Sequence, residues 1–337
     1  MKAVVYSIKS YEKEYIAKAN QKKHDITLIS NSLNVETANF AEGKDAVIVF
    51  TNDNLSAEVI TKLKSYGIKY IATRSTGTDH IDRKAASAVG MKIANVPNYS
   101  PQSIAEQAIT LILALNRKVN LAYNQTKKFD FRLTNLQGFC LHGKTVGLMG
   151  FGNVAKALAH ILNGFGCKIL VYDPYVNHFP KHVSPVSLED LYSKSAIISL
   201  HTPLNQETHY LIDQNTIAQM QNGVMLINTG CGALVNTIDV ISALSSGKIG
   251  YYGADVYENE SSLFFENHQT DIHKDTILQQ LMSFSNVIIT PHQAFFTQEA
   301  LQEIANKTIH NLDNWQNGKC VGKACACANS CQKETVK

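Results

Sequence analysis

A glycine-rich turn is the clearest chemical feature of the sequence. A short apolar run, residues 146–149, ends in Gly150-Phe151-Gly152, and a helical pattern of apolar residues follows from Val154. Glycine at position 150 permits a tight turn, and glycine at position 152 lets the backbone approach a phosphate closely. A helix that begins near Asn153 would direct unpaired backbone N–H groups and the positive end of its dipole toward the same point. The pattern predicts a site for the pyrophosphate of a dinucleotide.

An acidic residue completes this pattern at the end of the next apolar run. Residues 168–172 stop at Asp173, roughly twenty residues beyond the glycine turn, where dinucleotide-binding folds carry a carboxylate that accepts the ribose hydroxyls. A carboxylate there would repel a 2′-phosphate, which favours NAD over NADP. The third glycine position is Ala155, which the looser form of the fingerprint allows. Strand, glycine turn, helix, strand and acid together are far more specific than the glycines alone.

An imidazole and a carboxylate late in the chain could move a proton. His292 follows Thr290-Pro291, and histidine changes charge near neutral pH without heavy tuning. Glu260, in the segment 255–260, could hold the ring in one tautomer and raise its pKa by favouring the protonated form. A histidine after proline is often a turn residue, and paired acids are often a solvated face. Their common position after two late predicted strands favours an acid–base pair.

Alternating strands and helices must position these groups. Strands that alternate with helices predict a parallel sheet with right-handed crossovers, and ligands gather at the carboxyl ends of such strands. The notable residues fall at or just past predicted strand ends, namely Gly150, Asp173, His201, Thr229, Asp255 and His292. The second half of the chain is therefore expected to be a dinucleotide-binding domain.

The first hundred residues carry an α/β alternation of their own. Five apolar runs suit buried parallel strands, at residues 3–6, 26–29, 46–50, 70–73 and 93–96. Ser100 suits a helix N-cap with Pro101 at the first helical position, so a domain boundary is expected there. A last helix from Thr297 to about Trp315 would return the chain to the first domain.

The predicted fold class is thus α/β, with two Rossmann-like or flavodoxin-like domains, each a doubly wound parallel sheet. The cofactor domain, residues 101–297, would be inserted in a discontinuous substrate domain, residues 1–100 and 298–320.

Composition excludes several classes of protein. The 337 residues are 45% hydrophobic and 18% charged, which suits a two-domain globular protein. The formal net charge is +3 and the basic residues are scattered, which argues against a nucleic-acid surface. No apolar run approaches the ~20 residues of a membrane span, and the N-terminal apolar stretch is too short for a signal peptide. We expect a cytoplasmic protein that binds neither nucleic acid nor membrane.

Four of the seven cysteines lie in the C-terminal segment, namely Cys320, Cys325, Cys327 and Cys331. They could chelate a soft metal, but their spacing matches no paired CxxC pattern. We expect a reduced, flexible tail over residues 321–337, without a metal site or a disulfide framework.

Several motifs, in order and correctly spaced, resemble one enzyme family. They are RSTGTDHID (74–82), NVPNYSPQSIAEQA (95–108), GLMGFGNVAKALA (147–159) with Asp173, SLHTPLNQETHYLI (199–212), NTGCGALVNT (228–237), DVYENESSLFFE (255–266) and TPHQAFFTQEA (290–300). Over roughly residues 1 to 320 the chain resembles the D-2-hydroxyacid dehydrogenases, and within them the bacterial fermentative D-lactate dehydrogenases. The resemblance implies reduction of a small 2-keto acid, usually pyruvate, by NADH, in a homodimer or homotetramer formed through the cofactor domain.

The resemblance also implies roles for individual residues. His292 would protonate the keto oxygen, and Glu260 would orient His292. Residues that would contact the cofactor are Gly150, Gly152, Asn153, Val154, Asp173, His201, Thr202, Pro203, Thr229, Gly230 and Asp255. Backbone N–H groups of Thr76 and Gly77 would receive the substrate carboxylate, and Tyr99 and Phe295 would shape an apolar pocket for its methyl group.

Cys231 departs from the family pattern. The family places an arginine at this position of NT-x-R-G-A-L-V, where it binds the substrate carboxylate and polarises the carbonyl. A thiol is a weak neutral donor and cannot make a bidentate, charge-assisted pair. Three interpretations follow. In the first, Cys231 is a substitution, natural or engineered, in an otherwise ordinary enzyme of this family and weakens it. In the second, another cation, Arg74, serves instead. In the third, the protein binds NAD and keto acid without useful turnover. A reactive thiol would need an electropositive setting.

Overall fold

The computed structural model describes residues 1–271 and 275–328. Backbone contacts divide the chain into two compact units. Unit 1 comprises Met1–Ser100 and the described chain from Phe296 onward, and unit 2 comprises Pro101–Phe295. Each unit contains one parallel sheet, so the predicted α/β class with two doubly wound sheets is confirmed.

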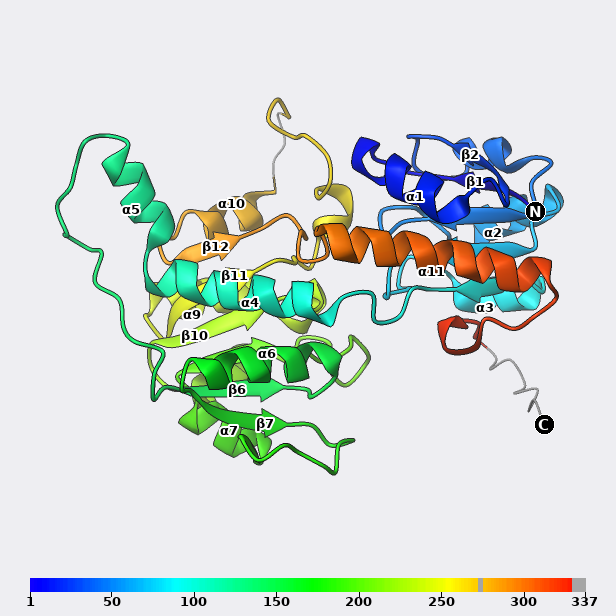
Figure 1. Ribbon diagram of the computed structural model, residues 1–337. Helices are drawn as coiled ribbons and strands as arrows, with labels where there is room; N and C mark the ends of the chain where they lie inside the picture. The colour runs from blue at the N-terminus through cyan, green and yellow to red at the C-terminus, as the bar shows by residue number, and fades with distance from the viewer. Residues whose placement is uncertain (272–274, 329–337) are drawn as a thin grey trace. The chain divides into compact units, whose positions relative to one another are not determined.

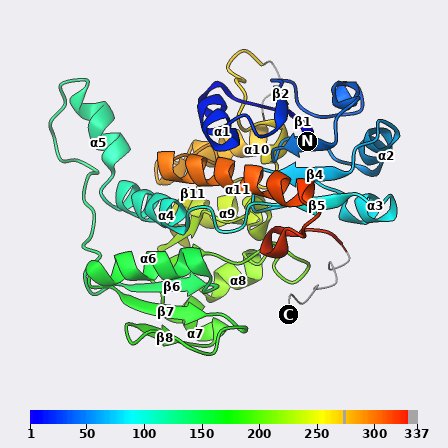
Figure 2. The same ribbon diagram turned by 45° about the vertical axis from the view of Figure 1, so that its right-hand side comes forward.

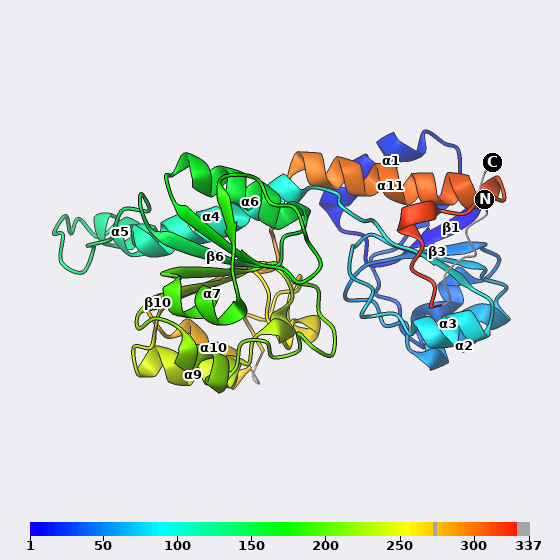
Figure 3. The same cartoon turned by 90° about the horizontal axis from the view of Figure 1, so that it is seen from below.

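The sheet of unit 1 has five strands in the order β2-β1-β3-β4-β5. They are β1 (Lys2–Val5), β2 (Asp25–Leu28), β3 (Ala46–Val49), β4 (Tyr70–Thr73) and β5 (Lys92–Ala94). Its helices are α1 (Lys13–Asn20), α2 (Ala57–Ser65), α3 (Arg83–Ala88) and α11 (Gln298–Gln316), with 3-10 turns at η1 (Ser10–Glu12) and η2 (Thr37–Ala41). Figure 3 shows α1 and α11 on one face of this sheet and α2 and α3 on the other. Apolar strand residues therefore pack on both faces.

The sheet of unit 2 has seven strands in the order β12-β11-β10-β9-β6-β7-β8. They are β6 (Thr145–Met149), β7 (Lys168–Tyr172), β8 (Val183–Pro185), β9 (Ile197–Leu200), β10 (Val224–Asn228), β11 (Ile249–Ala254) and β12 (Val287–Ile289). Its helices are α4 (Pro101–Asn116), α5 (Val119–Thr126), α6 (Asn153–Gly164), α7 (Leu188–Lys194), α8 (Gln214–Gln219), α9 (Thr237–Ser245) and α10 (Thr276–Met282). Two short 3-10 turns, η3 (Gly232–Leu234) and η4 (Glu260–Ser262), follow β10 and β11.

The strand order of unit 2 reverses at β6. Helices α4 and α6 cover one face of the sheet, and α7, α9 and α10 cover the other (Figure 3). The segments that follow β6 and β9 turn to opposite faces of the sheet. A crevice at the carboxyl ends of the strands is expected where the strand order reverses in this way. The glycine turn follows β6, and so it lies at this point.

The C-terminal segment corrects one prediction. Residues Gly322–Ala324 form the turn η5, in the red segment that follows α11 in Figure 2. Cys325 makes an antiparallel bridge with Ala94 at the outer edge of β5. The backbone N–H of Ala326 donates to Ile93. This part of the chain is therefore packed on unit 1 and is not the free tail expected from residue 321, because it pairs with an exposed sheet edge. Cys331 and its neighbours lie outside the described residues.

Helix α5 carries no buried residue, and it projects from the rest of unit 2 (Figure 1). The segment after it exposes Phe129, Phe131 and Leu133, which are 85%, 68% and 81% accessible. Large apolar side chains this exposed on one projection are uncommon on a monomer surface.

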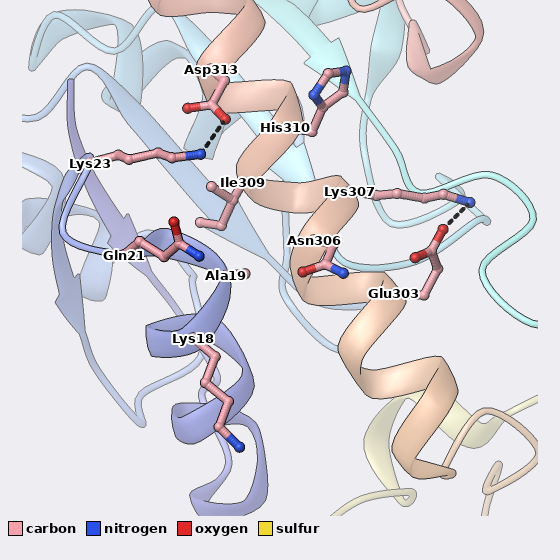
Figure 4. Close-up of a pocket in the computed structure, with 10 residues that line it drawn as sticks. All are labelled: Lys18, Ala19, Gln21, Lys23, Glu303, Asn306, Lys307, Ile309, His310 and Asp313. Carbon is pink, nitrogen blue, oxygen red and sulfur yellow. Dashed lines mark hydrogen bonds and ion pairs between the residues drawn. The ribbon is translucent and has the colours of Figure 1, made fainter.

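Unit 1 carries a groove of about 460 Å³ between α1 and α11 (Figure 4). Its charged side chains include Lys23, which pairs with Asp313, and Lys307, which pairs with Glu303. In Figure 4 these two pairs lie on different sides of α11 and do not converge. None of the residues predicted to do chemistry lines the groove. Across the described ranges no helix combines the length and the apolar character that a membrane span requires.

Candidate active site

Glycine is required at the turn that follows β6. Gly150 has φ +88°, and a Cβ atom there would lie 2.7 Å from the carbonyl oxygen of His201. Gly152 is the N-cap of α6, and a Cβ atom at this position would meet nothing within 4 Å. Open space therefore lies in front of the first turn of α6, whose leading N–H groups a glycine cap cannot satisfy. A phosphate fits this site by charge and by hydrogen bonding.

Asp173 is fixed beside the glycine turn. Its Oδ2 accepts a hydrogen bond from the backbone N–H of Phe151 at 2.7 Å, and its Oδ1 accepts one from Tyr175 at 2.9 Å. Each carboxylate oxygen can accept more than one hydrogen bond. The carboxylate is therefore held in place and keeps acceptor capacity for a pair of ribose hydroxyls.

Two threonines at neighbouring strand ends have unsatisfied hydroxyl groups. The Oγ1 atoms of Thr202, after β9, and Thr229, after β10, are buried and have no hydrogen-bond partner among the described residues. A buried hydroxyl without a partner costs about 1–3 kcal/mol. Such orphan groups at the carboxyl edge of the sheet suit a polar ligand, so the residues present fit a dinucleotide.

His201 directly precedes Thr202 after the end of β9, and its imidazole is neutral at physiological pH. Its Nε2 is 2.9 Å from the hydroxyl of Ser199, and burial lowers the pKa of its imidazole to about 4. The remaining residues predicted for the cofactor, Asn153, Val154, Pro203 and Gly230, lie on α6 or on the loops after β9 and β10.

The structure brings His292 and Glu260 together. Nδ1 of His292 lies 2.7 Å from Oε1 of Glu260, while Oε2 of Glu260 accepts from the backbone N–H of Tyr257 at 2.9 Å. His292 has φ +53°, and its N–H donates to the carbonyl of Thr290, so the loop after β12 turns sharply at this residue. An ionised carboxylate only accepts, so Nδ1 donates to it and Nε2 remains for a substrate.

Opposing effects set the pKa of His292. Burial lowers the pKa, whereas the hydrogen bond and charge of Glu260 and the charge of Asp255 raise it. The net result is a pKa above the ordinary value of histidine. The side chain still has 28% of its surface exposed, so a small molecule can reach the ring.

Asp255 supports the loop that carries His292. It has no exposed surface, and its carboxylate accepts from the hydroxyl of Thr290 and from the N–H groups of Gln293 and Ala294. Burial raises the pKa of Asp255, and these hydrogen bonds oppose the rise. Three donors from the His292 loop therefore hold a buried carboxylate. The contact of Asp255 with the nicotinamide end of the cofactor stays a prediction.

Two aromatic rings flank the imidazole. The ring of Phe265 is 5.9 Å from that of His292, the ring of Phe295 is 6.4 Å from it, and the two phenyl rings are 6.3 Å apart. Phe295 was predicted to shape an apolar pocket, and it lies where it can. Phe265 was missed, although it belongs to the DVYENESSLFFE segment, because no local pattern distinguishes its ring from a core residue.

Cys231 lies on the loop after β10, which packs tightly on the loop of Glu260. The side-chain amide of Asn228 donates to the carbonyl of Cys231 at 2.9 Å. A Cβ atom at Gly232 would lie 2.2 Å from the carbonyl oxygen of Tyr257, so only glycine fits there. Cys231 is half-buried against the apolar cluster of unit 2. These contacts fix the backbone at Cys231, the position of the family's arginine. The side chain there is a neutral thiol and not a cation.

In unit 1, the loop after β4 contains the predicted carboxylate-binding N–H groups. Thr76 Oγ1 donates to Val96, Asn95 Nδ2 donates to the carbonyl of Thr76, and Ser75 Oγ donates to the carbonyl of Gly77. The backbone N–H groups of Thr76 and Gly77 donate to none of the described residues. The loop is therefore rigid and leaves two donors for a ligand. Tyr99 is half-buried just before α4.

Arg74 is not available as a replacement cation. Its side chain has no exposed surface, and its Nε lies 3.3 Å from Oε1 of Glu12. Its Nη2 donates to the carbonyl of Tyr6 at 3.2 Å, and the guanidinium lies 5.3 Å from the ring centroid of Phe50. The structure corrects the substrate role considered for Arg74, because partners within unit 1 already hold its charge.

Among the described residues, no cluster of three or more histidine, cysteine or acidic side chains is placed to hold a metal ion. Unit 2 carries the candidate dinucleotide site at β6, β7, β9 and β10, and the pair His292–Glu260 after β11 and β12.

Known proteins resemble this chain in sequence and in fold. The sequence profile of the family described as "D-isomer specific 2-hydroxyacid dehydrogenase, NAD binding domain" matches residues 109–294. The chain is 44% identical to a D-lactate dehydrogenase of Curvularia clavata, with 94% of this chain and 93% of the relative aligned. It is 41% identical to the D-lactate dehydrogenase of Escherichia coli, over 95% and 98% of the two chains.

A solved structure described as the pyruvate reductase of Chlamydomonas reinhardtii superposes with a TM-score of 0.89 at 37% identity, over 96% of this chain and 98% of that one. With the glycine turn, the fixed Asp173 and the His292–Glu260 pair, these matches show that the chain belongs to the D-isomer-specific 2-hydroxyacid dehydrogenases and uses NAD.

Proposed function

We propose that the protein reduces pyruvate, or a similarly small 2-keto acid, to the D-2-hydroxy acid with NADH. The observation that carries the proposal is the 2.7 Å contact between His292 Nδ1 and Glu260 Oε1 in the unit that holds the dinucleotide site. Relatives named as D-lactate dehydrogenases and as a pyruvate reductase support the choice of substrate.

His292 is the proposed general acid. Bound NADH supplies the hydride. Nε2 of His292 donates a proton to the keto oxygen, and Glu260 stabilises the imidazolium before the transfer and keeps the ring oriented. The raised pKa of His292 keeps the ring protonated over more of the neutral range, which suits an acid in the direction of reduction.

The proposed substrate contacts would favour small keto acids. The N–H groups of Thr76 and Gly77 receive the carboxylate as donors from a rigid loop. The rings of Phe265 and Phe295, both near His292, exclude water from the side chain of the substrate. A methyl group suits this apolar setting better than a polar or charged side chain.

Cys231 lowers the proposed activity. A bidentate arginine would make two hydrogen bonds to the substrate, each worth about 1.5–3 kcal/mol when a charged group is involved. Their loss costs roughly 3–6 kcal/mol, and if it falls on the transition state the rate drops by about 10²–10⁴-fold. Enzymes can accelerate reactions by more than this factor, so a measurable rate should remain.

The same residue favours a second candidate function. Without the arginine, the protein could bind NAD and a keto acid with no useful turnover and act as a binding or regulatory protein. The two functions differ in one assay, in which the chain is incubated with NADH and pyruvate and the product is resolved by chirality. D-lactate formed by the chain and lost in His292→Gln supports the enzyme. NADH binding without turnover on small 2-keto acids supports the alternative.

We further propose that two or more copies associate through unit 2. The projection formed by α5 and the following segment exposes Phe129, Phe131 and Leu133, and a second copy could cover these side chains. Sedimentation of the chain and of a variant with all three residues changed to serine tests this. A monomer in both cases would exclude the assembly.

A further inference from the structure

We infer that Gln107 is a positioning residue for His292 and acts on it through Thr290 and Asp255. No site residue identified above lies on α4, yet one face of this helix contacts the loop of residues 290–294. The inference rests on the proposed acid–base role of His292 for its functional meaning, but the geometry and its test do not depend on turnover.

A continuous chain of hydrogen bonds carries the inference. Nε2 of Gln107 donates to Oγ1 of Thr290 at 3.0 Å, and that hydroxyl donates to Oδ1 of Asp255. Asp255 also accepts from the N–H groups of Gln293 and Ala294, at 2.9 and 2.7 Å. All these atoms belong to unit 2. The amide of Gln107 is thus two hydrogen bonds away from a carboxylate that holds both backbone positions directly after His292.

A second contact fixes the same loop from the same helix. The hydroxyl of Ser103 donates to the carbonyl of Ala294. Ser103 and Gln107 are four residues apart, so they lie on one face of α4, one turn apart. Helix α4 therefore forms hydrogen bonds with both ends of the segment 290–294, at Thr290 and at Ala294.

The direction of the hydrogen bonds gives Gln107 its specific effect. A threonine hydroxyl carries one proton, and an ionised carboxylate can only accept. Because the Gln107 amide donates to Thr290, the single hydroxyl proton is committed to Asp255. An apolar side chain at position 107 would leave that hydroxyl free to rotate toward other acceptors, and the buried carboxylate would lose part of its compensation.

Loss of this compensation should reach His292 by charge and by geometry. In the described chain, the titratable groups that act on His292 are Glu260, from the η4 turn, and Asp255, from the end of β11. Both favour the imidazolium. Burial disfavours the ionised form of Asp255, and the Thr290 hydroxyl is the first of the donors that oppose this effect. A weaker donor set would make Asp255 a poorer anion and would loosen the left-handed turn at His292.

The test measures the pKa of His292 directly. Nuclear magnetic resonance titration of the imidazole in the cofactor-free protein, with His292→Gln to assign its signal, would be compared between the unchanged chain and Gln107→Met. Methionine has nearly the length of glutamine and lacks the amide. We expect the pKa of His292 to fall by about half a unit or more, since one hydrogen bond to a charged group is being weakened. Gln102→Met, an exposed change on the same helix, is the matched control and should leave the pKa unchanged.

Thr290→Val gives an independent arm in case Gln107→Met folds poorly. This variant removes the hydroxyl that links the Gln107 amide to the Asp255 carboxylate, so the pKa of His292 should fall. Adding Gln107→Met to Thr290→Val should have little further effect, because both residues act through the same series of hydrogen bonds. Thr290→Ser retains the hydroxyl and should restore the pKa. An unchanged pKa in both Gln107→Met and Thr290→Val overturns the inference. Failure of the proposed function would show differently, as a chain with the expected pKa shifts and no turnover of pyruvate.

Discussion

Oε1 of Glu260 lies 2.7 Å from Nδ1 of His292, and Oε2 of the same carboxylate is held by the N–H of Tyr257. The carboxylate therefore has a fixed position, and the imidazole has one favoured orientation. The contact with Glu260 sets both the protonation state and the orientation of the His292 ring. Glu260 is therefore the first target for mutation.

Replacement of Glu260 by glutamine should shift the pH profile of pyruvate reduction toward acid. Reduction needs the imidazolium, so the rate falls as pH rises through the pKa of His292. Glu260 raises this pKa, and a neutral amide removes its charge while keeping a hydrogen-bond acceptor. At neutral pH we expect kcat/KM to fall on the order of ten-fold, because less imidazolium is present and its orientation is weaker.

The measurement is kcat/KM for pyruvate from pH 5 to pH 9. The variant should recover part of the lost rate at the acid end, where any imidazole is protonated. A uniform loss at every pH would instead indicate that Glu260 acts only on the geometry.

Arginine at position 231 should increase activity. The backbone of the Cys231 loop is fixed by Asn228 and by the close packing of Gly232 on Tyr257, so the new side chain would start from a defined position. If it makes the missing bidentate contact, kcat/KM for pyruvate should rise by about 10²–10⁴-fold. Steady-state kinetics of Cys231→Arg and of Cys231→Lys, which lacks the bidentate fork, provide the comparison. Equal rates in the original chain and Cys231→Arg would show that this position is not the missing anchor.

Local patterns predicted the fold well but missed some elements that carry no such pattern. Each principal strand coincides with a short apolar run of the sequence. The glycine turn lies directly after β6, where the strand order reverses. Helix α5 was not predicted because it buries no residue and so has no apolar periodicity. The pairing of Cys325 with Ala94 was missed because segments distant in sequence meet at an open sheet edge.

Site residues could be predicted where the residue type alone indicates the chemistry. They could not be predicted where tertiary packing determines which side chains lie near the site. His292 and Glu260 have chemistry that stands out in a sequence, whereas the closeness of Phe265 to the imidazole depends on tertiary packing. Arg74 shows the opposite error, since a cation next to a binding loop looks functional until its buried partner Glu12 is seen. Thr290 and Gln107 were overlooked because polar residues on a helix and before a proline have many ordinary roles.

Asp173 should control the choice between NADH and NADPH. Its carboxylate is held by the N–H groups of Phe151 and Tyr175 and can accept ribose hydroxyls while repelling a 2′-phosphate. We expect the chain to bind NADH more tightly than NADPH. Asp173→Ala should lower the affinity for NADH by at least about ten-fold, because a charge-assisted hydrogen bond is lost. Fluorescence titration with both cofactors measures the ratio. Asp173→Asn keeps one acceptor and should be intermediate, and an original preference for NADPH would contradict the assignment.

Removal of Arg74 should destabilise unit 1 rather than alter substrate binding. Arg74→Met leaves the carboxylate of Glu12, which is only 10% exposed, without its partner, and breaking a buried ion pair costs about 3–5 kcal/mol. The double variant Glu12→Gln/Arg74→Met removes both charges, and it should be more stable than Arg74→Met because no uncompensated charge remains. Urea unfolding of the three variants and the original chain tests the order of stability, and KM for pyruvate is measured below the unfolding transition. A raised KM without a loss of stability would return Arg74 to the substrate site, whereas loss of stability at unchanged KM identifies the guanidinium as part of the core of unit 1.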